Sequence, residues 1–140
     1  MRKSRIFLTF FLFLATIFQS LNAQEYGKAS VYSTRFQGGA TASGEKFNHS
    51  DFTVAHRTHK FNTRLRITRM DNGRSVIVRV NDRGPFVSDC VTDMSKATAT
   101  KLGISDDATI VQIKIEVVTD INIPLGSVTV VDKKKDNPTA

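Results

Sequence analysis

Alternation of apolar and polar residues constrains the fold of this chain more than any other feature of its sequence. In Val111-Gln112-Ile113-Lys114-Ile115-Glu116-Val117 the aliphatic residues occupy every second position, which is the pattern of a strand with one buried face. Two further apolar runs, residues 65–70 and 75–80, flank Asp71-Asn72-Gly73. The Asn-Gly pair is expected to supply the two positive-φ positions of a tight hairpin turn. The sequence therefore predicts a mainly β fold.

One helix and two more extended segments complete the predicted fold. Residues 96–102 are expected to form about two helical turns, capped at the start by Asp93 or Ser95 and closed by the glycine that follows. Residues 27–32 and 121–131 have the composition of short strands. The pattern contains no repeat and no linker, so we expect a single domain.

The first 23 residues have the composition of a cleavable secretion signal. A basic start, residues 1–5, precedes an apolar stretch over residues 6–18, and Leu21-Asn22-Ala23 fits the cleavage pattern before Gln24. The apolar stretch is shorter than the about 20 residues that a membrane helix needs, and no cysteine follows it to carry a lipid. We therefore expect residues 1–23 to be removed and the mature protein to be periplasmic, without a membrane anchor.

The remaining 117 residues have the size of one domain with one core. Because the predicted signal holds three basic residues and no acidic one, its removal lowers the formal net charge from +7 to +4. So small a charge disfavours nucleic-acid binding and allows only a weak attraction to anionic wall polymers. We expect one domain over residues 24–118, a short extension over 119–140 whose polar end frays, and a monomer.

Cysteine and histidine usage argues against a disulfide and against a metal site. Cys90 has no partner for an internal disulfide, so the core must hold the fold by itself, and a small buried side chain is expected there. His56 and His59 are too few for a zinc site, and no set of His, Cys and carboxylate residues has zinc-like spacing. No metal and no other cofactor is expected.

Three ionisable residues stand out as candidates for chemistry. Asp82 comes directly after a strand and before an Arg-Gly-Pro turn, where functional groups are often presented, although an Asp there can equally accept backbone N–H bonds. Glu45 follows a Ser-Gly pair on a loop, where a solvated surface acid is the alternative. His56 precedes a basic segment and can equally be a hydrogen-bonded structural residue.

These three residues belong to a longer ordered pattern. It comprises Gly27-Lys28-Ala29-Ser30-Val31-Tyr32, Thr41-Ala42-Ser43-Gly44-Glu45, Ala55-His56-Arg57-Thr58, Asn72 to Phe86, and Asp93-Met94-Ser95. In these motifs the chain resembles the rare lipoprotein A (RlpA) family over residues 27 to about 118, and Arg79 to Phe86 is the most specific part. The resemblance implies a mainly β fold, a six-stranded double-psi β-barrel with one or two short helices.

The resemblance also implies an activity. Barrels of that family look like endolytic lytic transglycosylases, which cleave the glycan strands of peptidoglycan and prefer strands stripped of their peptides. An acid protonates the oxygen between N-acetylmuramic acid and N-acetylglucosamine, and the muramic C6 hydroxyl closes a 1,6-anhydro ring. An ordinary two-carboxylate hydrolase must also place a water or a nucleophile. The alternative is a non-catalytic glycan-binding module similar to the barrels of plant wall-loosening proteins, the expansins.

Catalytic roles come to three residues through the resemblance. Asp82 is expected to be the general acid/base, in a groove beside Glu45, where shared negative charge and partial burial raise one of the two pKa values. The two acids can exchange roles. His56 is expected to orient the pair, and Asp93, which also matches the family, is expected to cap the helix.

Four residues near these motifs are the predicted substrate contacts: Tyr32, Phe36, Arg79 and Arg83. The two aromatic residues are as consistent with a groove that stacks on sugar rings as with core packing. The two arginines either hold the lactyl carboxylate of muramic acid or pair with Asp82. Phe47 and Phe86 border the same motifs and are expected to pack in the core.

Two features of many family members are not expected in this protein. Those proteins are lipoproteins and carry a C-terminal module that binds peptide-free glycan, whereas no lipid-bearing cysteine and no second module is recognisable here. The barrel itself is therefore expected to find the wall.

Overall fold

The computed structural model describes residues 23–86 and 88–130, and the predicted secretion signal lies almost wholly outside this part of the chain. The strands are, in chain order, β1 (Glu25–Val31), β2 (Thr53–His56), β3 (Arg64–Arg69), β4 (Arg74–Asp82), β5 (Thr92–Met94), β6 (Val111–Val117) and β7 (Val128–Val130). A 3-10 helix, η2 (Thr34–Phe36), and one α-helix, α2 (Lys96–Lys101), lie between them. No helix in the described ranges is long and apolar enough to cross a membrane.

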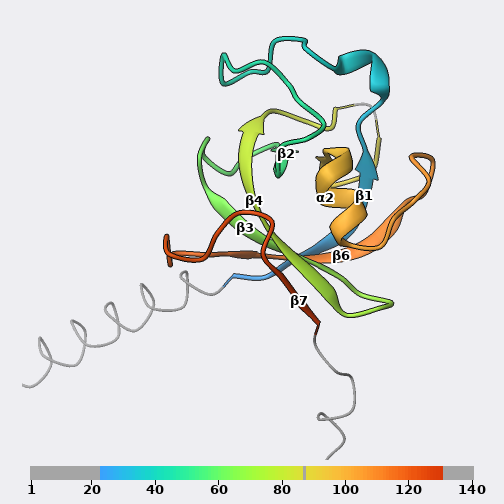
Figure 1. Ribbon diagram of the computed structural model, residues 1–140, viewed down its shortest axis with the longest axis vertical. Coiled ribbons are helices and arrows are strands. Elements are labelled where there is room, and N and C mark those ends of the chain that lie inside the picture. Colours follow the sequence, from blue (N-terminus) through green and yellow to red (C-terminus); the bar gives the residue numbers. More distant parts are fainter. Residues whose placement is uncertain (1–22, 87, 131–140) are drawn as a thin grey trace, which may run out of the picture.

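Six strands close into a barrel because β4 pairs with β2 as well as with β3 (Figure 1). The order around the barrel is β2-β5-β1-β6-β3-β4 and back to β2. The β1–β5 and β2–β4 pairs are parallel, and the other neighbours are antiparallel. β7 pairs with the first residues of β4, and β2 pairs with the last residues of β4 along the same edge of that strand. The six-stranded mixed barrel is therefore confirmed.

Strand alternation fills the barrel as predicted. Along β6, every second residue from Val111 to Ile115 is buried, and the residues between them are not. Across the β3–β4 pair, Leu65 lies opposite Val78 and both are fully buried. Burial of one such side chain contributes about 1.5–3 kcal/mol. The barrel interior is thus the core that holds a chain without an internal disulfide.

The predicted hairpin between β3 and β4 is confirmed, but its turn is wider than expected. Only Gly73 has a positive φ, 71°, so the expectation that Asn72 would share this conformation was wrong. The closing bond runs from the Gly73 N–H to the Arg69 carbonyl. The Asn72 side chain accepts from the Arg74 N–H and donates to the Leu102 carbonyl. Asn72 therefore ties the hairpin to the end of α2 instead of shaping a two-residue turn.

Helix α2 begins and ends close to the predicted residues. The Ser95 hydroxyl accepts from the Thr98 N–H at 3.3 Å, and Gly103 follows the helix with a φ of 77°. The expectation that Asp93 caps this helix was wrong, because Asp93 lies within β5, between β1 and β2. Its side chain is therefore available for another role.

Only part of the predicted strand over residues 121–131 forms. β7 covers its end, while three carbonyls before it, of Asp120, Ile121 and Ile123, accept from the Arg64 guanidinium. This arginine holds the segment against β3. Residues 119–130 of the predicted extension thus contact the barrel, and residues 131–140 lie outside the described part of the chain.

Candidate active site

A cavity of about 370 Å³ lies where β1 and β4 end. Its walls come from these strand ends, from β5, from the loop after β1 and from residues 83–86. In Figure 1 the loop after β1, drawn in blue to teal, extends beyond the barrel at this end. Two carboxyl groups, those of Asp82 and Asp93, line the cavity together. They are the core of the candidate site.

The Asp82 carboxylate accepts three hydrogen bonds. Its Oδ2 accepts from the Tyr32 hydroxyl at 2.6 Å, and its Oδ1 accepts from the N–H groups of Ala42 at 2.9 Å and Arg83 at 2.8 Å. Burial, and then the bond to Asp82, raises the pKa of the Tyr32 phenol. The phenol therefore keeps its proton and donates it. Asp82 is arranged as a fixed proton acceptor.

A tight loop presents the Ala42 N–H to Asp82. The Glu45 carbonyl accepts from both the N–H and the hydroxyl of Thr41 at 2.8 Å. Gly44 completes the turn with a φ of 91°, a conformation that favours glycine. The Ser43 N–H donates to the Asn81 carbonyl next to Asp82. The Thr-Ala-Ser-Gly-Glu motif therefore serves to hold one acidic residue of the site.

Asp93 is a functional candidate that the sequence reasoning assigned to another role. Its carboxylate accepts from the Ser30 hydroxyl, the residue opposite it in the parallel β1–β5 pair. Burial raises the pKa of Asp93, and the nearby negative charge of Asp82 adds to the effect. An acid within the otherwise uncharged segment Val91-Thr92-Asp93-Met94 is the sequence signal that marks it. Asp93 can thus retain its proton at a higher pH than an exposed aspartate.

Glu45 lies outside the cavity lining and forms an ion pair. Both of its carboxylate oxygens accept from the Arg79 guanidinium, at 2.5 and 2.8 Å. This bidentate bond lowers the pKa of Glu45. The expected rise in pKa at a Glu45–Asp82 pair therefore does not occur at Glu45, and the cavity carboxyl with a raised pKa is Asp93. Glu45 anchors the loop that holds Asp82.

Glu45→Gln is expected to lower stability only above the pH at which Glu45 ionises. Because the folded-state pKa lies below its ordinary value of 4.5, the ion pair stabilises the fold above that value and loses this effect as pH falls through the folded-state pKa. The cost near neutral pH is about 1 kcal/mol or less for a partly exposed pair. Thermal unfolding of both proteins from pH 3 to 7 measures it, and a constant difference across that range contradicts the assignment.

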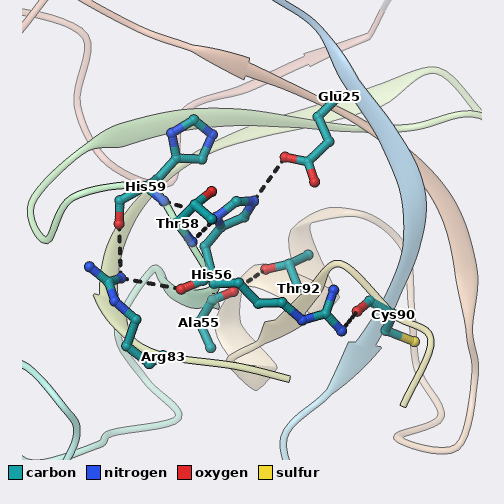
Figure 2. Close-up of polar contacts among 9 residues, drawn as sticks. Glu25, Ala55, His56, Thr58, His59, Arg83, Cys90 and Thr92 are labelled. Carbon is teal, nitrogen blue, oxygen red and sulfur yellow. Dashed lines mark hydrogen bonds and ion pairs between the residues drawn. The ribbon is translucent and has the colours of Figure 1, made fainter. Parts of the chain in front are cut away.

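His56 is buried, with 3% of its surface exposed, and lies outside the cavity lining. Figure 2 shows its ring between Glu25 and the following loop. Its Nδ1 accepts from the N–H groups of Thr58 and His59 at 3.2 and 3.1 Å. The proton of the neutral ring is therefore on Nε2, which donates to Glu25 at 2.8 Å. His56 holds a chain corner near the site rather than facing the cavity.

The same cluster is the best candidate for a metal among the described residues. Ligand atoms of Glu25, His56 and His59 lie within 4.8 Å of one another. A metal needs a free lone pair on the histidine nitrogen, however, and the proton on His56 Nε2 occupies that position. A metal-binding histidine normally donates its second N–H, whereas Nδ1 of His56 accepts. The hydrogen bonds thus suit a structural network better than a metal centre.

Two arginines fix the loop between Asp82 and Asp93. The Arg83 guanidinium donates to the carbonyls of His56 and His59, as Figure 2 shows, and its carbon lies 4.0 Å from the centre of the Phe61 ring. Arg57, which the sequence reasoning did not select, donates to the carbonyls of Pro85 and Cys90. The Cys90 side chain is buried and unbridged, as predicted.

Neither predicted cationic contact has a free guanidinium. Arg79 is bound to Glu45 and Asn62, and Arg83 is bound to backbone carbonyls. In the described ranges neither guanidinium is hydrogen-bonded to Asp82, which contacts only the Arg83 backbone. Both arginines are therefore arranged to support the site.

Aromatic side chains form much of the cavity wall. Tyr32 and Phe36 both line it, and their rings are in edge contact with centroids 5.8 Å apart. Phe47 is buried as expected and packs on Tyr32. The expectation that Phe86 packs in the core was wrong, since 77% of its surface is exposed at the cavity rim. The reason is that Phe86 follows Gly84-Pro85 on a loop that has left the barrel.

The sequence of the barrel matches a known protein family. The family model described as lytic transglycolase matches residues 24–115, which include Glu45, Asp82 and Asp93. The chain belongs to this family. The match covers the strands from β1 to β5 and most of β6, so the lytic transglycolase domain corresponds to the barrel with its cavity.

Curated relatives of this lytic transglycolase domain share about half of their residues with it where they align. The endolytic peptidoglycan transglycosylase RlpA of Pseudomonas aeruginosa is 51% identical over 90 residues, which are 64% of this chain and 26% of that protein. The protein of the same name from Neisseria meningitidis is 48% identical over 90 residues, 64% of this chain and 37% of that protein. The chain thus aligns with about a quarter to a third of the length of these relatives.

A solved structure shares the fold of this lytic transglycolase domain. The Streptomyces papain inhibitor superposes with a TM-score of 0.53 at 24% sequence identity, covering 69% of this chain and 94% of that one. At this identity the likeness concerns the architecture of the barrel.

Proposed function

We propose that this protein is an endolytic peptidoglycan lytic transglycosylase that acts in the periplasm and cleaves peptide-free glycan strands to 1,6-anhydromuramic ends. Relatives bearing the name endolytic peptidoglycan transglycosylase support the reaction class. One observation carries the proposal: two carboxyl groups line one cavity, and Asp82 accepts three hydrogen bonds while burial raises the pKa of Asp93. Such a difference is what separates an acid from a base at one pH.

Asp93 is the general acid of this proposal. Its raised pKa keeps the carboxyl protonated at a higher pH than an exposed aspartate, so a proton is available for the oxygen between the two sugars. The Ser30 hydroxyl holds one carboxyl oxygen and leaves the other for the substrate. General acid catalysis of this kind contributes about 10²–10⁴-fold to the rate.

Asp82 is the base and the electrostatic partner. As Asp93 donates its proton to the leaving oxygen, positive charge develops on the muramic ring, and the fixed Asp82 carboxylate stabilises it. The muramic C6 hydroxyl then attacks C1, and its proton passes to Asp82. One C–O bond breaks, one forms and no water is consumed. Exchange with solvent returns the proton to Asp93.

The aromatic wall fits a sugar chain. Phe36 and Phe86 are exposed at the cavity, and each offers an apolar face to a pyranose ring. Glu45 and His56 are positioning residues in this scheme, because one anchors the loop that donates to Asp82 and the other anchors the corner that Arg83 binds. For Glu45 this proposal differs from the expected role as one of the two acids, and for His56 it keeps an orienting role.

Product analysis tests the proposal. The purified domain is incubated with glycan strands that an amidase has freed of peptide, and the ends are analysed by mass spectrometry. Internal cleavage to ends that are one water lighter than a reducing muramic acid is expected. Binding of the strands without any cleavage contradicts the proposal and assigns the chain to the expansin-like glycan-binding modules.

A further inference from the structure

Among the described residues, one cation that lines the cavity, Arg35, has a guanidinium that is not hydrogen-bonded to a protein acceptor. Arg35 lines the cavity on η2, is exposed, and has no hydrogen bond or ion pair within residues 23–86 and 88–130. Its guanidinium carbon lies 5.0 Å from the centre of the Phe36 ring. Arg79, Arg83 and Arg57, by contrast, are bound to protein acceptors. Arg35 is therefore the cation that can bind an anion from solution.

An anionic ligand needs such a cation because the cavity itself carries negative charge. Asp82 and Asp93 line the same cavity, and the Asp82 carboxylate repels a negative group that enters it. Contact with the Phe36 ring favours a guanidinium that lies against the wall and reduces the number of positions it explores. A guanidinium held in this way can form two parallel hydrogen bonds to a carboxylate.

Peptide removal creates one carboxylate on the glycan substrate. In a peptide-bearing strand, the lactyl group of muramic acid ends in an amide and is neutral. After removal of the peptide it ends in a carboxylate with one negative charge. The two forms of the strand therefore differ, next to the reacting sugar, in the group that an arginine recognises.

We infer that Arg35 binds the lactyl carboxylate of muramic acid and is the specificity-determining residue for peptide-free strands. The inference rests on the proposed transglycosylase function. The substrate is then selected by its charge, which a residue of η2 at the cavity recognises. Arg79 and Arg83 support the site. A neutral lactyl amide gains no comparable bond from a guanidinium.

The test compares Arg35→Gln with native protein on two substrates: peptide-free strands and the same strands with their lactyl carboxylates converted to methyl amides. For peptide-free strands KM is expected to rise about tenfold, the loss typical of a bond to a charged group, with kcat within about twofold. For amidated strands little change is expected. Arg35→Lys keeps the charge and is expected to recover part of the affinity. Lys46→Gln is the matched control, an exposed cation on the same loop outside the cavity lining.

Two failures are distinguishable. If native protein cleaves neither substrate, the proposed function falls, and binding of both strands, followed by fluorescence anisotropy, still measures whether Arg35 selects the carboxylate. The assignment of Arg35 is overturned if native protein cleaves peptide-free strands and Arg35→Gln keeps the native preference for them over amidated strands. It is also overturned if Arg35→Gln raises KM equally for both substrates.

Discussion

Asp93→Asn is expected to lower the rate of glycan cleavage by at least about 100-fold, the lower end of what a general acid contributes. Asparagine has nearly the same shape and can still accept from the Ser30 hydroxyl, but it has no proton to give to the leaving oxygen. Initial rates of anhydro-end formation measure the loss. Asp89→Asn, an exposed acid on the preceding loop that pairs with Lys28, is the matched control and is expected to retain activity.

The same substitution is expected to stabilise the fold at neutral pH. The folded-state pKa of Asp93 is raised above its ordinary value of 3.8, so the folded protein binds more protons than the unfolded chain between these two values. Stability therefore falls as pH rises through that interval. Asparagine does not ionise, so its thermal midpoint should match native protein below about pH 3.8 and exceed it above. An inactive variant that is also less stable at pH 7 contradicts a buried catalytic acid.

Asp82→Asn is the second substitution with a large expected effect, a loss of about 100-fold. The asparagine oxygen can keep both backbone N–H bonds, and its amide can donate to the Tyr32 oxygen, so the loop is expected to stay in place. What disappears is the negative charge that stabilises the sugar cation and the group that takes the C6 proton. Hydrogen exchange of the Ala42 N–H reports whether the loop is retained.

Asp82→Asn is also expected to move the pH profile of the remaining activity. The charge of Asp82 contributes to the raised pKa of Asp93, so its removal lowers that pKa. The falling limb of the pH–rate profile, where the acid loses its proton, should shift to lower pH than in native protein. An unshifted limb means that the two carboxyls do not interact in the way proposed.

Local sequence patterns predicted the longer strands, but neither the short strands β2 and β5 nor the assembly of the sheet. Alternation along Val111–Val117 and the runs beside Gly73 predicted β6 and the β3–β4 hairpin. Closure of the barrel depends on the parallel β2–β4 pair, in which Thr53 lies opposite Arg79, and a contact between residues so far apart leaves no local signal. The closed barrel was therefore expected through the family resemblance alone.

The candidate site, like the fold, was predicted only in part from local sequence. The position of Asp82 at a strand end is visible in the sequence, and its catalytic role was expected through the family resemblance. The surroundings of Glu45 and Asp93 were not predicted because each depends on a distant partner: Arg79 pairs with the first, and the β1–β5 register places the second beside Ser30 and the cavity. A carboxylate on a loop and a carboxylate before a helix look alike in sequence, whereas their burial and partners determine their chemistry.

Digestion of peptide-free glycan strands in water enriched in heavy oxygen distinguishes a transglycosylase from a hydrolase and from a glycan-binding module. A transglycosylase closes the ring with the sugar's own hydroxyl, so we expect internal cleavage to 1,6-anhydromuramic ends that carry no heavy oxygen and that largely disappear with Asp93→Asn. Reducing ends that carry one heavy oxygen, or strands that are bound and left intact, would contradict it.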